Sequence, residues 1–254
     1  MNQAALTCTN IEVEFDGFKA VNGVDLTLDS GEVHFLIGPN GAGKTTLVDA
    51  ITGLTRYTGS VTKDGTELRG KKVHHIARKG IGRTFQTATV FEHLTVAQNL
   101  DIAAGSGRSP WHLLRQRRHL PDQVVAVMEQ IGLDGQAETA AGVLAHGQKQ
   151  WLEIGMLLVG DADVLLLDEP IAGMGHEERD RTGRLLHDIA ATRAVAVVEH
   201  DMDFMRAFAS RVTVLHAGAV LAAGTVDEVS GDPRVQAVYL GSVQEQEVAD
   251  AATA

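Results

Sequence analysis

Apolar and polar positions along the chain mark several strands. Residues 6–28 predict strands, because Ile11, Val13 and Phe15 alternate with charged residues, as do Val24, Leu26 and Leu28 after Asn22-Gly23. Continuous apolar runs predict buried strands at VHFLIG (33–38), VLLLDE (164–169) and AVAVVEH (194–200). Two further segments are typical of hairpins, namely 57–68, which turns at Asp64-Gly65, and 212–224.

Helical patterns fall between these strands. Residues 44–54 and a charged segment at about 176–192 predict helices, and residues 94–158 are mostly helical in pattern. Pro121 stands where a first-turn proline is tolerated. An apolar helix face follows it, formed by Val124, Val125, Val127, Met128 and Ile131.

Strands alternate with helices in the first and last thirds of the chain, which predicts an α/β fold. The expected core is a mainly parallel sheet with helices on its faces. The helical middle third interrupts the alternation, so we interpret it as a subdomain inserted into the core. We expect one domain over residues 1–241, with its core at about 1–86 and 160–241 and the insertion at about 87–159. Residues 242–254 are small and acidic, which favours a flexible tail.

Composition narrows the classes of protein. The formal net charge of −11 does not favour a nucleic-acid partner, because such proteins gather Lys and Arg against phosphate. Cys8 is the single cysteine, so no internal disulfide forms and a reducing compartment is expected. The N-terminus does not resemble a signal peptide, and no apolar run approaches the ~20 residues of a membrane helix. We therefore expect any membrane connection to come through a partner.

A glycine-rich segment follows the first buried strand and precedes a helix. GPNGAGKT (38–45) fits the phosphate-loop pattern G-x-x-x-x-G-K-[ST], and this context supports it. The glycines let successive N–H groups point at phosphate oxygens, and the helix N-terminus favours an anion. Lys44 is expected to neutralise the β- and γ-phosphates, and Thr45 to hold Mg²⁺. The predicted nucleotide-binding residues here are Gly38, Pro39, Asn40, Gly41, Ala42, Gly43, Lys44, Thr45 and Thr46.

Two carboxylates end a later buried strand. Asp168 and Glu169 follow four apolar residues, at the edge where ligands of open α/β sheets bind. Asp168 is expected in the Mg²⁺ shell, and Glu169 as the general base that polarises an attacking water. The alternative is that the two carboxylates only cap the next element.

Several motifs together resemble the ATPase subunit of ABC (ATP-binding cassette) transporters over nearly the whole chain. In the family's order they are Phe15, GPNGAGKTT (38–46, Walker A), Gln86, LAHGQ (144–148, signature), VLLLDEP (164–170, Walker B), AGMG (172–175, D-loop) and His200. The resemblance implies a P-loop NTPase (RecA-like) core with an N-terminal antiparallel β subdomain and an inserted α-helical signature subdomain. It also implies ATP and Mg²⁺ as ligands and ATP hydrolysis as the activity.

The resemblance assigns roles to residues that would not stand out alone. Phe15 would stack on adenine, with Phe18 as its rival. Gln86 would coordinate Mg²⁺, orient water and face the membrane subunit. His200 would contact the γ-phosphate. The signature residues would close on ATP held by a second subunit, through Ala145, His146, Gly147 and Gln148.

Two departures from the family pattern stand out. Position 145 is alanine where serine is common, and position 175 is glycine where D-loops often carry a polar residue. Each removes a side-chain contact across the dimer. If this chain pairs with a different ATPase, the two composite sites need not be equal, and we expect the site completed by this signature to be the weaker.

Longer stretches resemble the branched-chain amino acid and urea importer group. The KQW run (149–151) and the AGM of the D-loop (172–174) look closest to the first ATP-binding subunit of the urea importer. This implies a second ATPase subunit (a heterodimer, with a homodimer as the alternative), two membrane permeases and an extracytoplasmic substrate-binding protein. It places the chain at the cytoplasmic face of the bacterial inner membrane, held there by the permeases. Urea is the expected cargo on resemblance alone.

Other interpretations stay open. A branched-chain amino acid importer is the alternative cargo class, and an ATPase subunit of iron–sulfur cluster assembly is the non-transport alternative.

The segment 107–119 carries Arg108, Arg115, Arg117 and Arg118. It is either a solvated loop or a face that meets the permease or anionic lipid headgroups.

Overall fold

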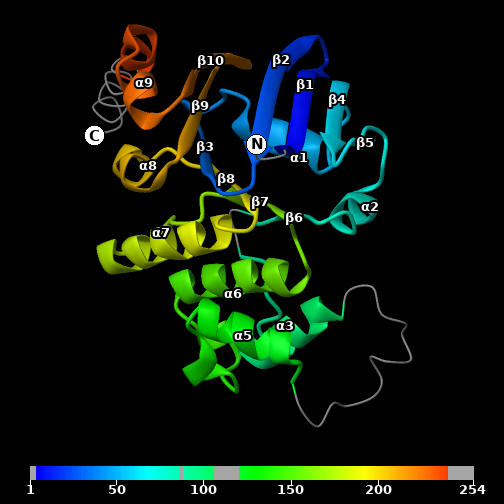
Figure 1. Cartoon of the computed structure of the whole chain (residues 1–254), viewed down its shortest axis with the longest axis vertical. Coiled ribbons are helices and arrows are strands. Elements are labelled where there is room, and N and C mark those ends of the chain that lie inside the picture. The colour runs from blue at the N-terminus through cyan, green and yellow to red at the C-terminus, as the bar shows by residue number, and fades with distance from the viewer. Residues whose placement is uncertain (1–3, 86–87, 106–119, 240–254) are drawn as a thin grey trace.

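The computed structural model describes residues 4–85, 88–105 and 120–239, and it contains two sheets with helices packed around them (Figure 1). Gln86, the arginine-rich segment 107–119 and the tail 242–254 lie outside the described residues. The smaller sheet is antiparallel, with the strand order β2-β1-β4-β5. Its strands are β1 (Ala4–Phe15), β2 (Phe18–Asp29), β4 (Thr58–Lys63) and β5 (Thr66–Glu67).

The larger sheet has six strands in the order β10-β9-β3-β8-β7-β6. Its strands run parallel except β10, which forms a hairpin with β9. The bounds are β3 (Val33–Ile37), β6 (Ile81–Arg83), β7 (Val164–Asp168), β8 (Ala194–Val198), β9 (Arg211–His216) and β10 (Ala219–Gly224). The predicted mainly parallel sheet of an α/β fold is therefore confirmed. The short edge strand β6 was not predicted from the sequence.

Helices and turns connect the strands. The described helices are α1 (Lys44–Ile51), α2 (Val73–Ala77), α3 (Val96–Ala104), α5 (Asp122–Gln130), α6 (His146–Val159), α7 (His176–Ala190), α8 (Met202–Phe208) and α9 (Val226–Ser230). Two 3-10 turns, Asp134–Gln136 and Ala141–Val143, separate α5 from α6. The segment 94–158, predicted as mostly helical, thus includes these two short turns between α5 and α6. Helices α2, α8 and α9 are too short to show a clear period in the sequence.

The apolar face predicted after Pro121 needs one correction. Val124, Val127 and Met128 are buried in α5, but Val125 is 39% exposed. A helix turns 100° per residue, so Val124, Val127, Met128 and Ile131 share one stripe at i, i+3, i+4 and i+7, and Val125 lies beside it. Pro121 itself lies at the N-cap, one residue before the helix, where its missing N–H costs no hydrogen bond.

The buried strands divide the core into two layers. Along β3, Val33, Phe35 and Ile37 point into one hydrophobic cluster, while Leu36 points into the other. The first cluster contains residues of α3, α5, α6 and α7, and the second contains residues of α1 and the antiparallel sheet. Because successive side chains alternate across a strand, a continuous apolar run is the pattern that a doubly covered sheet requires.

The strand register brings three strand ends together. Leu36 of β3 pairs with Val198 of β8, and Val198 pairs in turn with Asp168 of β7. Parallel neighbours in this register finish at the same edge of the sheet. The segments that follow β3, β7 and β8 therefore meet there, although β3 ends more than a hundred residues before β7 begins.

No helix of the described chain is long and apolar enough to cross a membrane.

Candidate functional site

The glycine-rich loop joins β3 to α1, and its glycines are required by close contacts. Gly43 has φ +99, and a Cβ on it would lie 2.4 Å from the Ala20 carbonyl oxygen. Gly38 has φ +151, and its Cβ would lie 2.2 Å from the Leu215 carbonyl oxygen. Any side chain at either position would displace backbone, so the loop keeps its curled shape only with glycine there.

Lys44 lies across this loop. Its Nζ donates hydrogen bonds to the carbonyl oxygens of Gly38 at 2.6 Å and Pro39 at 3.0 Å. Burial lowers the pKa of Lys44, while the carboxylates of Glu169, Asp168 and Glu199 act in the opposite direction. The ammonium is thus held over the loop, near the carboxylates that end β7 and β8.

A cleft of about 360 Å³ lies over the loop. Phe15 and Phe18 line it from the end of the β1–β2 hairpin, where they are cross-strand partners. Phe15 is 48% exposed and Phe18 is 68% exposed, so both rings are accessible for stacking. The other lining residues are Ala20, Asn40, Gly41, Ala42, Gly43, Lys44, Thr45, Thr46, Glu169 and Val198.

Asp168 is buried at the end of β7. Its Oδ2 accepts a hydrogen bond from Arg83 Nη2 at 3.3 Å, and its backbone N–H donates to Thr84 Oγ1 at 3.2 Å. Its Oδ1 is buried without a hydrogen-bond partner. Burial raises the pKa of Asp168, and the Arg83 guanidinium opposes this shift.

The unpartnered Oδ1 fits a divalent cation. Among the described residues no three His, Cys, Asp or Glu side chains gather to form a protein-only metal site. Mg²⁺ does not need one, because it is commonly held by one or two protein oxygens together with substrate phosphates and water. Asp168 Oδ1 and the exposed hydroxyl of Thr45 are the protein oxygens available for such a cation.

Arg83 is a site residue that the sequence interpretation missed. Its guanidinium forms ion pairs with both Asp49 of α1 and Asp168, and its side chain is only 7% exposed. Arg83 therefore ties the helix that follows the phosphate loop to the carboxylate on β7. One signal for Arg83 was present in the sequence. It stands at the end of a short segment of apolar and glycine residues, Ile81–Arg83.

Glu169 projects into the cleft from a strained backbone. Its φ is +49, and its N–H donates to the Val198 carbonyl oxygen at 2.9 Å. A positive φ at a non-glycine residue costs on the order of 1 kcal/mol and marks many functional positions. His200 follows β8, and its Nδ1 lies 3.5 Å from Glu169 Oε1. The fold thus brings two of the predicted catalytic residues together.

Glu199, between β8 and His200, is a second residue without an assigned role in the sequence interpretation. Its side chain is 2% exposed and accepts N–H bonds from His200 at 3.2 Å and Ile171 at 3.4 Å. Burial raises the pKa of Glu199, and these N–H bonds counteract the shift. The carboxylate fixes the backbone at His200 and the turn after Glu169.

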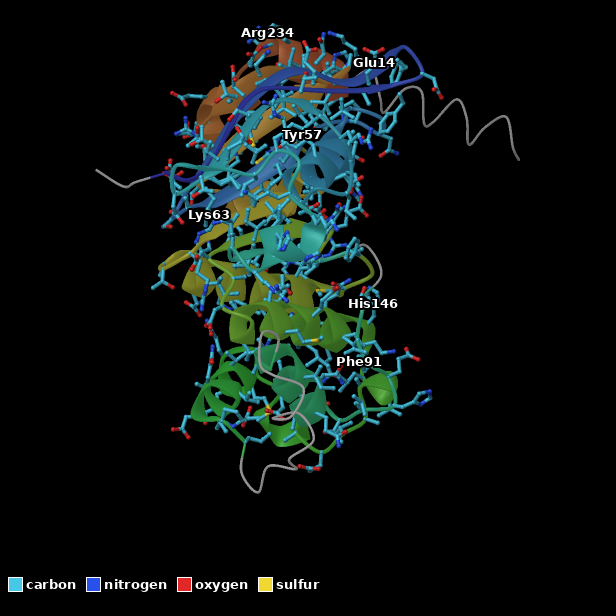
Figure 2. All side chains as sticks on the ribbon, turned by 90° about the vertical axis from the view of Figure 1, so that its right-hand side faces the viewer. Glu14, Tyr57, Lys63, Phe91, His146 and Arg234 are labelled. Atoms are coloured by element: carbon cyan, nitrogen blue, oxygen red, sulfur yellow. The ribbon has the colours of Figure 1, made fainter. Side chains whose placement is uncertain are left out.

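The predicted signature residues lie away from this cleft. Figure 2 places His146 in the helical part of the molecule. None of the residues that line the cleft comes from 144–148. Ala145 is the N-cap of α6, and Gln148 Oε1 accepts its N–H at 3.0 Å, but alanine offers no oxygen to the helix. The first N–H groups of α6 therefore lack a side-chain acceptor from the N-cap.

The signature helix packs closely on the D-loop segment of the same chain. A Cβ on Gly147 would lie 2.9 Å from Glu178 Oε1, the end of a flexible side chain on α7. Trp151 Nε1 donates to Thr182 Oγ1 at 2.8 Å, and Thr182 Oγ1 donates to Met174 Sδ at 3.3 Å. These contacts connect α6 to the segment that follows Glu169.

Comparisons with known proteins agree with this geometry. Residues 21–172 match the ABC transporter family, and residues 219–244 match the branched-chain amino acid ATP-binding cassette transporter family. The chain is 35% identical to the high-affinity branched-chain amino acid transport ATP-binding protein BraF of Pseudomonas aeruginosa, over 95% of this chain and 99% of that protein. It is 34% identical to LivG of Escherichia coli K12, with the same coverage.

The solved structure of an ATP-binding cassette of an ABC transporter in its ADP conformation superposes with a TM-score of 0.81. That structure is 30% identical in sequence, and the match covers 94% of this chain and 99% of that one. A nucleotide-free cassette gives a TM-score of 0.80 at 30% identity, covering 93% and 99%.

Proposed function

The chain belongs to the ABC transporter family, and from this membership we propose that it is the ATPase subunit of a branched-chain amino acid importer. Cassettes of this family are ATPases that power transport, and they work as dimers with membrane permeases. The observation that carries the cargo proposal is the similarity to BraF and LivG over almost their full length. The C-terminal match over 219–244 supports the same group.

The cargo differs from the one expected from the sequence. The KQW run and the AGM of the D-loop favoured urea, whereas the relatives found are named for branched-chain amino acids. These relatives therefore support a branched-chain amino acid importer, which was the alternative from the sequence, better than a urea importer, which was the first choice. They also give no support to an iron–sulfur cluster assembly subunit.

We infer the following division of work within the cleft. The loop N–H groups and Lys44 hold the phosphates, after Lys44 leaves the carbonyl oxygens of Gly38 and Pro39. Phe15 stacks on adenine, with Phe18 as the alternative ring. Thr45, Asp168 and Gln86 hold Mg²⁺, which when bound neutralises charge on the β- and γ-phosphates.

Glu169 is the proposed general base, because its carboxylate faces the cleft and is partly exposed to water. His200 stands 3.5 Å from it and is the proposed contact for the γ-phosphate. Glu199 and Arg83 act as positioning residues behind these two groups. The geometry places all four on the edge formed by β6, β7 and β8.

The partner arrangement follows from the position of the signature helix. Residues 144–148 do not line the cleft of their own chain, so we propose that they close on ATP held by a second ATPase subunit. A heterodimer is the preferred arrangement and a homodimer the alternative. ATP would join the two subunits, and hydrolysis would release them.

A permease is the proposed partner for the segment around Gln86. Phe85 is 43% exposed and Phe91 is 52% exposed, and they flank this glutamine in sequence. Exposed aromatic side chains are enriched at protein interfaces. We place the subunit at the cytoplasmic face of the bacterial inner membrane, held there by two permeases that receive cargo from a substrate-binding protein.

Uptake of labelled leucine and labelled urea, in a strain that lacks this gene, tests the cargo proposal. We expect leucine uptake to fall and urea uptake to stay unchanged. Complementation with the wild-type gene should restore uptake, while a Glu169→Gln gene should not. Loss of urea uptake with intact leucine uptake would overturn the branched-chain amino acid proposal in favour of urea.

A further inference from the structure

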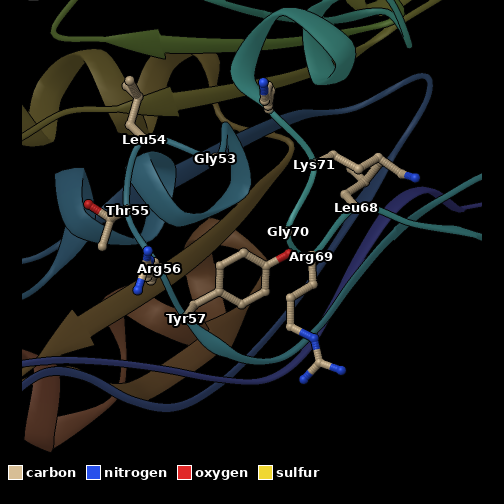
Figure 3. A pocket seen from close by; sticks show the side chains of 10 residues that line it. Gly53, Leu54, Thr55, Arg56, Tyr57, Leu68, Arg69, Gly70 and Lys71 are labelled. Carbon is tan, nitrogen blue, oxygen red and sulfur yellow. The ribbon is translucent and has the colours of Figure 1, made fainter.

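A second pocket lies at the end of α1 opposite the phosphate loop. It has a volume of about 480 Å³ and opens between two segments, residues 53–57 after α1 and residues 68–72 before α2 (Figure 3). Its lining residues are Gly53, Leu54, Thr55, Arg56, Tyr57, Leu68, Arg69, Gly70, Lys71 and Lys72. We refer to this set as the basic pocket. None of these residues lines the nucleotide cleft.

The basic pocket gathers positive charge on an acidic protein. Arg56, Arg69, Lys71 and Lys72 line it, and no carboxylate does. The chain as a whole carries a formal net charge of −11. Among the described residues none of these four side chains forms an ion pair.

The carboxylates in the surrounding sequence already have other partners. Glu67 accepts hydrogen bonds from Ser60 and from the backbone N–H groups of Val61 and Arg69. Asp49 is paired with Arg83, and Asp64 with Lys63. These three carboxylates therefore do not neutralise the basic pocket. Glu12 and Glu14 share a neighbouring pocket with Arg56 and Tyr57, so Arg69, Lys71 and Lys72 provide most of the attraction for an anion.

Tyr57 adds a hydrogen-bond donor to the basic pocket. Its hydroxyl is buried and has no hydrogen-bond partner. Figure 3 shows its ring across the space between the two segments, with the hydroxyl toward Arg69 and Gly70. Burial and the nearby Glu67 raise the pKa of Tyr57, so the hydroxyl keeps its proton. A ligand that accepts a hydrogen bond from this hydroxyl would supply the partner that it lacks.

One feature of the fold opposes an anion here. The basic pocket lies at the C-terminal end of α1, which carries a partial charge of about −0.5. Four full positive charges outweigh this, because the helix effect is limited to the last turn. The net field favours a negative ligand.

We propose that the basic pocket binds a phosphate-bearing anion, which Arg56, Arg69, Lys71 and Lys72 neutralise and the Tyr57 hydroxyl hydrogen-bonds. Arginine and lysine are the usual phosphate-binding side chains. A soluble phosphorylated compound and a phospholipid headgroup present the same group. This site is separate from the ATP cleft and does not depend on the identity of the cargo.

Two probes distinguish these sources. The full chain is first saturated with Mg²⁺ and a non-hydrolysable ATP analogue, so that the phosphate loop is occupied. Glycerol 3-phosphate is then titrated by calorimetry. In parallel, the protein is sedimented with vesicles of phosphatidylcholine mixed with phosphatidylglycerol, and with vesicles of phosphatidylcholine alone. Binding of glycerol 3-phosphate identifies a soluble ligand, and binding only to the mixed vesicles identifies a lipid headgroup.

The variant Arg56→Gln/Lys71→Gln removes two charges of the basic pocket. The control Arg184→Gln/Arg206→Gln removes two exposed charges on α7 and α8. We expect the first pair to weaken binding by about 30-fold and the second to leave it unchanged, since each basic residue contributes about 1 kcal/mol near a phosphate surface. Tyr57→Phe should weaken binding by about 5-fold. Binding of the ATP analogue by every variant checks the fold.

The proposal is overturned if neither probe binds, or if the pocket variant and the control variant bind equally. Equal weakening by both pairs would show a response to net charge and not a site.

Discussion

His200 Nδ1 lies 3.5 Å from Glu169 Oε1, where β7 and β8 end side by side. The two side chains differ in exposure, at 66% for His200 and 29% for Glu169. The histidine is the more exposed of the two, while the carboxylate lines the cleft beside Lys44 and the phosphate loop.

Replacing Glu169 with glutamine should separate ATP binding from hydrolysis. The amide keeps the shape of the side chain but cannot accept a proton from water, so turnover should fall by about 100-fold or more. The chain should then accumulate as an ATP-bound dimer with its partner ATPase. Phosphate release and size-exclusion chromatography measure the two effects. Wild-type turnover would exclude Glu169 as the general base.

Lys44→Ala should abolish nucleotide binding, because Lys44 is the cation of the phosphate loop. Calorimetric titration with ATP in the presence of Mg²⁺ measures this. Lys79→Ala removes the same charge from an exposed lysine outside the cleft and serves as the control. An unchanged ATP affinity of Lys44→Ala would refute the phosphate-loop assignment.

Ala145→Ser should restore an N-cap to α6. A serine hydroxyl can accept an N–H of the first turn, which should raise the free energy of unfolding by about 1 kcal/mol in a urea titration. In the assembled transporter the same hydroxyl should increase ATPase activity modestly. Ala145→Gly is the matched control without a hydroxyl. A decrease in activity would show that the backbone N–H groups already bind the phosphate without help.

Glu153→Gln should change how stability depends on pH. The Glu153 side chain is buried in α6 and accepts the Thr89 N–H at 3.2 Å. Burial raises the pKa of Glu153 from 4.5 to about 7. Because the folded pKa is the higher one, this group's contribution is fully present below pH 4.5 and is lost as pH rises through about 7.

The free energy of unfolding of the wild type should therefore fall over this pH range by up to about 3 kcal/mol relative to Glu153→Gln. Urea titrations at a series of pH values measure the difference. His34 provides an internal check, because burial lowers its pKa to about 4 and its contribution is lost on the acid side in both proteins. Parallel curves for the two proteins would contradict the assignment to Glu153.

Thr182→Val should destabilise the contact between α6 and α7. The valine has nearly the same shape, but it leaves the buried Trp151 Nε1–H without its acceptor. The expected loss is about 1–3 kcal/mol in the free energy of unfolding. Thr182→Ser retains the hydroxyl and should cost less. If valine costs no more than serine, the hydrogen bond contributes no more than the methyl group that serine lacks.

Much of the site was predictable because its motifs are local. The phosphate loop is a continuous segment whose shape follows from glycines at positive φ, and it begins where an apolar run ends. Asp168 and Glu169 likewise follow an apolar run. Parallel strands covered on both faces leave such runs in the sequence, and their C-terminal ends share one edge. The sequence alone therefore determined the α/β class, the loop and the carboxylates.

Only the tertiary structure decided which residues support those groups. Arg83 belongs to a three-residue strand with no readable period, yet it pairs with Asp168 from 85 residues away. Glu199 was identifiable only as a carboxylate at a strand end, and its hydrogen bond to the Ile171 N–H depends on the register of β7 and β8. The basic pocket joins two segments across the end of α1. Such contacts arise from strand pairing and helix packing between distant segments, which local periodicity does not encode.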